Sequence, residues 1–338
     1  MRMRTLGRSG LFVSELCFGT MTFGGSEGIW GLIGQLDQTQ ADELIKTALE
    51  GGINFFDTAN AYGEGASEKI LGQSLKNLAV KREELVIATK VLIPMGKGPN
   101  NCGASRGHIL HQVKASLTRL QLDYIDLYQI HGFDPATPIE ETLEALNTLV
   151  QQGYVRYIGL SNWAAWQVVK AIGITQARHL APIISLQAYY TLVGRDLERE
   201  VLPMLESEQV GLMVWSPLAG GYLSGKYSGD GQTESGRRQK FDFPPVDLQR
   251  GAKALELIRE LAKEKDCSVA QVALAWLLHQ NGVSSVIIGA KNNQQLQENL
   301  GSVDVRLNED ELLGLKKATE LAPEYPGWML ERQGAHRQ

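Results

Sequence analysis

The chain has 338 residues, 43% of them apolar and 21% charged, which is close to globular averages and excludes a disordered chain. Lys and Arg number 33 against 38 Asp and Glu, a formal net charge of −5, and without a basic tract this balance gives no support for a nucleic-acid or anionic-membrane partner. No apolar run reaches the ~18 residues of a membrane span. Three scattered cysteines and an N-terminus without an apolar signal region predict a reduced, cytoplasmic protein.

The predicted elements begin with a small N-terminal β-hairpin over residues 4–13, with Gly10 in its middle. Short apolar or β-branched runs then alternate with longer segments of helical period. Strands are predicted at 15–19, 54–57, 85–89, 125–130, 155–160, 183–188, 211–215 and 285–288. Helices are predicted at 39–50, 67–78, 106–120, 139–152, 163–175, 196–208 and 251–280.

This alternation determines the expected fold class. Strands separated by helices cannot be joined by hairpins, so they should lie parallel and be covered by helices. Eight such units favour a closed (β/α)8 TIM barrel over an open doubly wound sheet, and residues 1–338 are predicted to form a single domain. Residues 218–250 are rich in Gly, Ser, Arg and Pro and lack periodicity, which predicts a long loop after the seventh strand.

Titratable residues stand where three neighbouring strands are predicted to end. Asp57, Lys90 and His131 each close an apolar run, and the reacting groups of such barrels lie at the C-terminal ends of the strands. Alone, each is as easily a turn, solvated or locally hydrogen-bonded residue. Tyr62, five residues after Asp57, can reach the same rim.

These four residues make chemical sense together. The pKa of a tyrosine is about 10, and a nearby ammonium is expected to lower it by roughly 1–3 units, so Lys90 would activate Tyr62. Asp57 would hold Lys90 charged, and His131 would orient a substrate carbonyl. The pattern predicts a general acid aimed at a carbonyl group, with hydride supplied from elsewhere.

Three segments resemble the signatures of the aldo-keto reductase superfamily: Asp57-Thr-Ala-Asn-Ala-Tyr62-Gly, Thr89-Lys90 and Asp126-Leu-Tyr-Gln-Ile-His131. The likeness extends over residues 6–312 and keeps the order and spacing of the motifs. It implies a (β/α)8 barrel that binds NADPH or NADP+ without a separate dinucleotide-binding domain and reduces aldehydes and ketones. It also implies that Asp57, Tyr62, Lys90 and His131, called the tetrad below, are the catalytic residues.

The resemblance further implies a set of cofactor-binding residues. Ser161, Asn162 and Gln187 match residues that bind the nicotinamide carboxamide, and Trp215 matches the aromatic residue, often tyrosine, that stacks on the nicotinamide. Lys291 matches the cation placed against the 2′-phosphate of NADPH. The loop at 218–250 resembles the segment that folds over the pyrophosphate. Gln295, Glu298 and Asn299 match the positions around the adenine. The other members of the set are Gly19, Thr20, Met21, Asp57, Ser216, Pro217, Leu218, Gly220, Lys226, Arg238, Gly289 and Ala290.

Aromatic residues in the predicted rim loops suggest a substrate pocket. Phe23, Trp30 and Phe133 would line it beside Tyr62 and His131, although loop aromatics can equally pack locally. Two other patterns are set aside. The glycines after Tyr62 lack the third glycine of a dinucleotide-binding turn, and His108 and His111 have no third ligand nearby, so no metal is predicted.

The leading hypothesis is an NADPH-dependent reductase of aromatic and aliphatic aldehydes and of dicarbonyls such as methylglyoxal, in which Tyr62 donates the proton. The alternative is an NADPH-binding regulatory or redox-sensing module like the β-subunits of potassium channels, because the resemblance implies the tetrad there as well. A metal-dependent hydrolase is disfavoured for want of a histidine cluster. The physiological substrate and the oligomeric state stay open.

Overall fold

Eight parallel strands close on themselves in the computed structural model, which describes residues 1–25, 27–227 and 237–335. Each strand pairs with the next along the chain, and β10 pairs with β3 to complete the ring. The predicted (β/α)8 barrel is thereby confirmed. Its strands are β3 (Leu16–Gly19), β4 (Phe55–Asp57), β5 (Val86–Val91), β6 (Ile125–Ile130), β7 (Val155–Ser161), β8 (Ile183–Tyr189), β9 (Gly211–Trp215) and β10 (Val283–Ile288).

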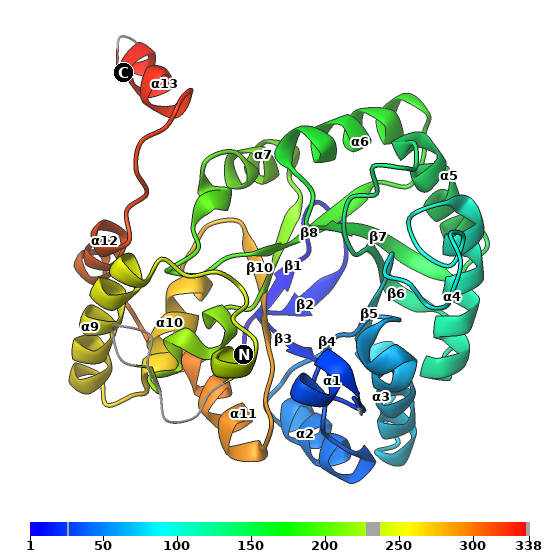
Figure 1. The fold of residues 1–338 in the computed structure, drawn as a ribbon, viewed down its shortest axis with the longest axis horizontal. Helices are drawn as coiled ribbons and strands as arrows, with labels where there is room; N and C mark the ends of the chain where they lie inside the picture. Colours follow the sequence, from blue (N-terminus) through cyan, green and yellow to red (C-terminus); the bar gives the residue numbers. More distant parts are fainter. Residues whose placement is uncertain (26, 228–236, 336–338) are drawn as a thin grey trace.

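Helices surround the barrel on its outside (Figure 1). They are α2 (Gln38–Glu50), α3 (Ala66–Asn77), α4 (Arg106–Leu120), α5 (Ile139–Gln151), α6 (Ala165–Ala177), α7 (Val201–Glu208), α9 (Leu248–Glu264), α10 (Val269–Leu278), α11 (Asn293–Leu300) and α12 (Glu309–Ala318). Short 3₁₀ turns are η1 (Tyr62–Gly65), η2 (Arg82–Glu84), η3 (Asp196–Glu198), η4 (Ala219–Ser224) and η5 (Gly301–Asp304). No helix of the described residues has both the length and the apolar character needed to cross a lipid bilayer.

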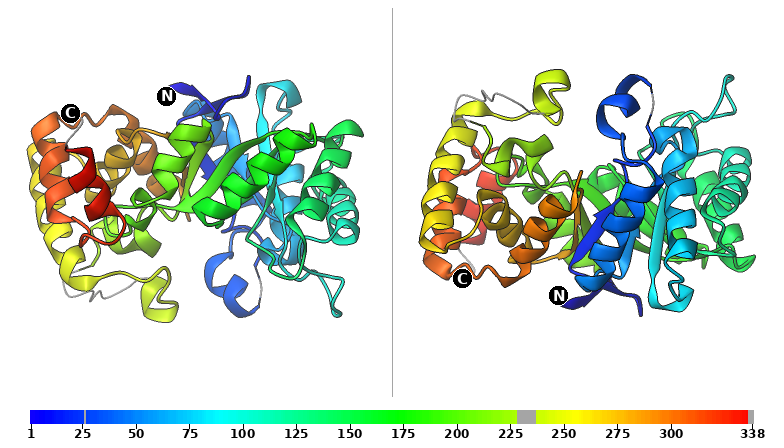
Figure 2. Two further views of the ribbon diagram at one scale, coloured as in Figure 1. Left: turned by 90° about the horizontal axis from the view of Figure 1, so that it is seen from above. Right: turned by 90° about the horizontal axis from the view of Figure 1, so that it is seen from below.

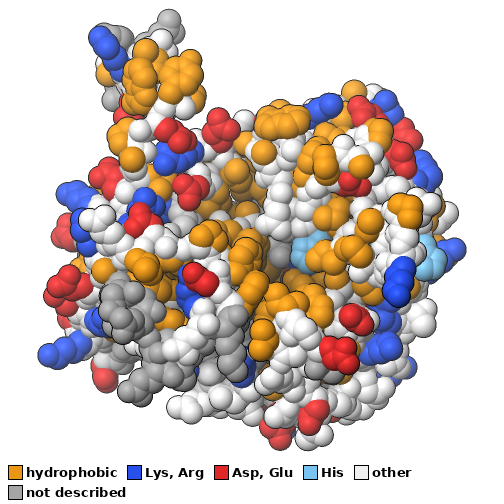
Figure 3. All heavy atoms as spheres, in the orientation of Figure 1, with side chains coloured by type: hydrophobic (Ala, Val, Ile, Leu, Met, Phe, Trp, Pro, Cys, Tyr) orange, Lys and Arg blue, Asp and Glu red, His pale blue; other side chains and the backbone are white. Residues whose placement is uncertain are grey.

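The two ends of the barrel differ. The predicted N-terminal hairpin is present as antiparallel strands β1 (Met3–Thr5) and β2 (Phe12–Ser14), and its Leu6 and Val13 are fully buried against the residues that fill the barrel interior. The hairpin therefore closes the N-terminal end. Two short helices, α1 (Gly28–Ile33) and α8 (Arg237–Lys240), project from the opposite face and approach each other there (Figure 2). That face is hollowed at its centre and rimmed by hydrophobic side chains (Figure 3).

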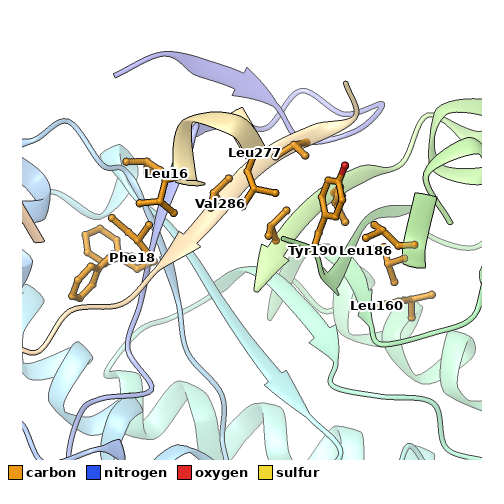
Figure 4. Packing of buried hydrophobic residues seen from close by; sticks show 14 of the residues in the cluster. Leu16, Phe18, Leu160, Leu186, Tyr190, Leu277 and Val286 are labelled. Atoms are coloured by element: carbon orange, nitrogen blue, oxygen red, sulfur yellow. The ribbon is translucent and has the colours of Figure 1, made fainter. Parts of the chain in front are cut away.

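Alternate strand residues face the barrel interior and the helices. Leu16, Phe18 and Val286 point outward and belong to the large core between strands and helices, where Leu277 of α10 also packs (Figure 4). Their neighbours in the chain, such as Cys17, pack inside the barrel. This alternation follows from the pleat of a β-strand. By the same alternation, Asp57 at the end of β4 faces inward with Phe55, whereas Phe56 between them faces the helices.

Two predicted segments are organised differently from expectation. The helix expected over 251–280 is two helices, because Ser268 forms a capping box with Gln271 and starts α10 after a break behind α9. The segment 218–250 carries η4, α8 and the start of α9, so it is not an uninterrupted loop. Residues 228–236 of this predicted loop lie outside the described residues.

Five helices of the described residues were not predicted: α1, α8, α11, α12 and α13 (Gly327–Gly334). Two of them carry readable N-terminal signals, since Asn292 caps α11 and Asn308 forms a capping box with Glu311 at the start of α12. Helix α13 stands away from the barrel at the end of an extended segment (Figure 1) and buries none of its residues.

Candidate active site

Tyr62 reaches the barrel mouth on a tight loop after β4. The backbone of this loop continues the sheet, because Thr58 N–H donates to Ala88 O at 2.9 Å and Asn60 N–H donates to Lys90 O at 3.2 Å. The chain then turns through η1, where Gly65 has φ 92°. A Cβ at Gly65 would lie 2.7 Å from Arg119 Cδ, so only glycine fits there. The glycines that imitate a dinucleotide-binding turn thus form the turn behind Tyr62.

Three members of the tetrad form one hydrogen-bonded group. Lys90 Nζ donates to Asp57 Oδ2 at 2.5 Å, to Thr58 O at 2.9 Å and to Tyr62 Oη at 3.2 Å. The Lys90 side chain has no exposed surface, and that of Asp57 is 3% exposed. A buried ammonium is tolerated only when it is paired and hydrogen-bonded, and all three hydrogens of Lys90 Nζ have acceptors here.

The charge balance of this group corrects one expectation. Desolvation raises the pKa of Tyr62, and the opposing effect of Lys90 does not cancel it, so Tyr62 is held as the neutral phenol and not pushed toward the phenolate. Burial alone would lower the pKa of Lys90, but Asp57 and Tyr62 outweigh burial and raise it. The pair therefore keeps a permanent cation against a protonated hydroxyl, which is the state a proton donor needs.

His131 follows β6 directly and lies next to Tyr62. The two rings are 5.8 Å apart between centroids in an edge-on arrangement, and His131 N–H donates to Val91 O at 2.9 Å. Desolvation, helped by the charge of Lys90, lowers the pKa of His131 to about 3. Its Nδ1 is buried and has no partner among the described residues. A buried N–H without an acceptor is costlier than a bare lone pair, so the imidazole is neutral with its proton on Nε2.

The low pKa of His131 makes the stability of the fold pH-dependent. Above the ordinary value of 6.5, the imidazole is neutral in both the folded and unfolded chain. As the pH falls from 6.5 toward about 3, the unfolded chain binds a proton that the folded chain does not, so the free energy of unfolding decreases. We expect His131→Gln to lose less stability than the wild type between about pH 7 and about pH 5, measured by urea denaturation. Equal losses in both proteins would contradict the assignment.

In the side-chain amides of Asn162 and Gln187, the N–H groups already have partners, and only oxygen acceptors are free to bind a further group. Asn162 Nδ2 donates to His131 O at 3.0 Å and to Ser161 Oγ at 3.1 Å, while Asn162 Oδ1 accepts from Trp215 Nε1 at 2.9 Å. Gln187 Nε2 donates to Asp57 Oδ1 at 2.9 Å and to Gln129 Oε1 at 3.2 Å. The two residues adjoin, because Asn162 N–H donates to Gln187 O at 3.0 Å.

This inventory fits a primary carboxamide. Gln187 Oε1 and one lone pair of Asn162 Oδ1 can each accept an N–H, and the Ser161 hydroxyl, which already accepts from Asn162, can donate to a carbonyl oxygen. A carboxamide presents two N–H groups and one carbonyl oxygen. Three of the predicted cofactor residues therefore suit the nicotinamide amide.

Trp215 stands beside these amides at the end of β9. Its indole is fixed by the hydrogen bond to Asn162 and by the Tyr189 ring, whose centroid is 5.0 Å away. The ring of Phe243 lies parallel to Trp215 at 5.8 Å. Phe243 thus occupies a face of the Trp215 indole, and the stacking of a nicotinamide on Trp215 stays a prediction.

Lys291, predicted to face the 2′-phosphate, shortly precedes α11, and the residues predicted around the adenine lie on that helix. Lys291 is exposed, and its backbone N–H donates to Gln295 Oε1 at 3.0 Å. Asn299 Nδ2 donates to Gly289 O at 3.2 Å and ties the helix to the end of β10. A helix N-terminus with an adjacent lysine suits an anion. Glu298 lies on the same helix, and Ala290 is buried beside Thr22, whose Oγ1 donates to Ala290 O at 3.3 Å.

The remaining predicted cofactor residues support the mouth in different ways. Thr20 N–H donates to Asp57 O at 2.9 Å just beyond β3, which ends at Gly19 and is followed closely by Met21. Ser216 Oγ accepts from Gly220 N–H at 3.0 Å, which fixes the turn through Pro217 and Leu218.

Arg238 is engaged inside its own loop. Its guanidinium donates to Ala219 O at 3.1 Å and to Pro244 O at 2.6 Å, and it pairs with Asp242. Lys226, by contrast, is exposed. A contact between Arg238 or Lys226 and a pyrophosphate stays a prediction.

The predicted substrate pocket is corrected at one position. Phe23 is fully buried and packs on Phe18, with ring centroids 6.0 Å apart, because the chain after β3 turns back to pair with Leu36. It is a core residue and cannot line a pocket. Trp30 of α1 does face the site, 5.6 Å from the Tyr62 ring.

Phe133, the other predicted pocket aromatic, belongs to a cluster at the edge of the mouth. Its ring lies 5.0 Å from Trp163 and 6.4 Å from Trp166. Phe133 therefore packs locally beside the mouth. This is the alternative to pocket lining that the sequence left open for the loop aromatic residues.

One buried residue at the tetrad was missed. Gln129 lies on β6, two residues before His131, and its Nε2 donates to Asp57 Oδ1 at 3.0 Å. The signal was present in the sequence: a glutamine between Tyr128 and Ile130, two residues before His131 and therefore on the same, inward-facing side of the strand. Among the described residues no group of three or more His, Cys, Asp or Glu is arranged to hold a metal ion.

Comparison with known proteins agrees with this geometry. The model of the Aldo/keto reductase family matches residues 15–320. A protein of Arabidopsis thaliana named "Probable voltage-gated potassium channel subunit beta" is 38% identical over 314 residues, which cover 90% of this chain and 92% of the relative. A protein of the same name from Oryza sativa subsp. japonica is 36% identical over 311 residues, again 90% of this chain and 92% of the relative.

Proposed function

Because the chain belongs to the aldo/keto reductase family, a family of oxidoreductases, we propose that it reduces aldehydes and ketones to alcohols with NADPH. The observation that carries this proposal is the neutral Tyr62 hydroxyl, hydrogen-bonded to a buried and charged Lys90 at the mouth of the barrel. That arrangement is a proton donor without a nucleophile, which suits a carbonyl oxygen that gains negative charge.

Each tetrad residue has a definable task in this reaction. His131, neutral and protonated at Nε2, donates a hydrogen bond that orients the carbonyl oxygen beside Tyr62. Tyr62 then gives its proton to that oxygen, and the Lys90 cation stabilises the phenolate that remains. Asp57 keeps the Lys90 ammonium in place.

A reduced nicotinamide, when bound, supplies the hydride for this chemistry. Ser161, Asn162 and Gln187 offer the hydrogen-bonding groups that its carboxamide requires, and Trp215, bonded to Asn162, is the ring that we propose stacks on the nicotinamide. The site excludes part of the solvent by burial, since Gln187 is 3% exposed and Ser161 is 1% exposed. These residues would hold a reduced nicotinamide at the same end of the barrel as Tyr62 and His131.

Lys291 is proposed to select the phosphorylated cofactor. Its ammonium is exposed beside the N-terminus of α11, where a 2′-phosphate would gain a charge-assisted hydrogen bond. We expect Lys291→Ala to weaken NADPH binding by about 10-fold or more while NADH binding changes little. Fluorescence titration of both cofactors measures this, and equal losses for NADPH and NADH would show that Lys291 does not bind the phosphate.

The proposed activity is tested by following NADPH consumption with aromatic aldehydes, aliphatic aldehydes, dicarbonyls such as methylglyoxal, and sugars. Substrate-dependent oxidation that disappears in Tyr62→Phe supports it. Oxidation that persists unchanged in that variant would arise elsewhere and would refute the mechanism.

A second candidate function comes from the names of the two plant relatives. In it, the protein binds NADPH as a cytoplasmic regulatory or redox-sensing subunit of a membrane channel. NADPH that is held tightly, with negligible turnover over the whole substrate panel and a channel protein that co-purifies, would favour this candidate over the reductase.

A further inference from the structure

Gln129 occupies a position between the tetrad and the predicted carboxamide site. It lies on β6 in register with Lys90 of β5 on one side and with Gly159 of β7 on the other, and its side chain is fully buried. A buried amide is costly unless its donors and acceptor are satisfied, so the partners of Gln129 define what it does.

Both ends of the Gln129 amide are used by functional residues. Its Nε2 donates to Asp57 Oδ1 at 3.0 Å, and its Oε1 accepts from Gln187 Nε2 at 3.2 Å. Gln187 Nε2 also donates to Asp57 Oδ1 at 2.9 Å, which closes a triangle of three side chains. The other oxygen of Asp57 accepts from Lys90. The triangle therefore joins Asp57, the partner of Lys90, to Gln187 of the predicted carboxamide site.

We propose that Gln129 is a positioning residue that holds Asp57 for Lys90 and holds Gln187 with its Oε1 toward the cofactor. This inference rests on the proposed function and assigns its two effects to different atoms of one side chain. The N–H of Gln129 serves Asp57, and the carbonyl oxygen of Gln129 serves Gln187. Substitutions that remove one or both of these atoms should separate the effects.

The first test is Gln129→Met, which keeps the length of the side chain and removes both hydrogen bonds. We expect kcat to fall by about 10- to 100-fold, the scale of a lost hydrogen bond to a charged group. We also expect a change in cofactor discrimination. The 3-acetylpyridine analogue of NADPH has a methyl group in place of the carboxamide nitrogen, and the wild type should bind it more weakly. In Gln129→Met the ratio of the affinity for NADPH to that for the analogue should fall toward 1, because Gln187 is less firmly held.

The second test is Gln129→Glu, which keeps an oxygen acceptor for Gln187 and removes the donor to Asp57. We expect the preference for NADPH over the analogue to be retained while kcat falls. Two carboxyl groups that share a site cannot both ionise easily, so at lower pH the new carboxyl group is protonated and can donate to Asp57. The ratio of variant to wild-type kcat should rise as the pH falls from about 8 to about 6. The titratable groups around this position are Asp57, Lys90, Tyr62, His131 and Cys17.

Gln176→Met is the matched control, since Gln176 is exposed on α6. It should leave unchanged kcat, the preference for NADPH over its analogue, and the pH dependence of kcat relative to the wild type. Melting temperatures show whether Gln129→Met or Gln129→Glu is unfolded. If one of them is, the other still tests the positioning role. An unchanged kcat in Gln129→Met would overturn the positioning role. So would a preference for NADPH over its analogue that changes equally in Gln129→Met and Gln129→Glu.

The two proposals fail in different ways. If the wild type consumes no NADPH with any carbonyl compound, the proposed function fails. The discrimination between NADPH and its analogue, measured by fluorescence titration, tests Gln129 without any turnover.

Discussion

Tyr62→Phe is expected to lower kcat by about 10²- to 10⁴-fold while the affinity for NADPH stays the same. The substitution removes the hydroxyl to which Lys90 Nζ donates at 3.2 Å and nothing else. The ring keeps its neighbours, Trp30 at 5.6 Å and His131 at 5.8 Å, so the shape of the mouth is preserved. Steady-state kinetics with saturating NADPH, together with fluorescence titration of the cofactor, measure the two quantities separately.

Tyr124→Phe is the matched control for this experiment. Tyr124 lies before β6, and its ring is contacted by Arg82 and Arg156, each 4.1 Å from the ring centroid. Those contacts use the face of the ring and survive the loss of the hydroxyl, so this variant should retain full activity. A Tyr62→Phe protein as active as the control would exclude Tyr62 as the proton donor.

Lys90→Met is expected to abolish activity and also to destabilise the fold by about 3–5 kcal/mol. It removes the cation from a pair whose side chains are 0% and 3% exposed, and it leaves the Asp57 carboxylate buried with only the amides of Gln129 and Gln187 as partners. Urea denaturation at neutral pH measures the free energy of unfolding. A loss below about 1 kcal/mol would show that the pair behaves like an exposed salt bridge.

The double variant Asp57→Asn/Lys90→Met separates charge from packing. It removes both charges, so no unpaired ion remains in the barrel, and a buried pair replaced by neutral groups of similar size is often tolerated. We expect most of the stability lost in Lys90→Met to return while activity stays absent. If the double variant is as unstable as the single one, the lost stability comes from packing and not from the uncompensated charge.

The barrel was predictable because its sequence signals are local and repeated. Each buried parallel strand is a short apolar run between helices, and the ends of those runs mark the ends of the strands. Asp57, Lys90 and His131 stand at such ends, so the rule that places the chemistry of a barrel on one face is enough to bring them together. The structure does so, with Tyr62 among them.

What could not be predicted depends on contacts between distant segments. The position of Phe23 in a loop after a strand predicts a pocket residue, but the return of the chain to Leu36 buries it. The pKa of Tyr62 was expected to fall because of Lys90, but the degree of desolvation, which reverses the direction, is set by the packed mouth as a whole. The amide orientations of Gln129 and Gln187 likewise depend on partners from three strands.

The hairpin closes the barrel at its N-terminal end. Leu6 and Val13 pack there with the side chains that fill the barrel interior, so among the described residues the approach to Tyr62 lies on the face that carries α1 and α8. Under the proposed function, the carbonyl compound would enter and the alcohol would leave by this same face.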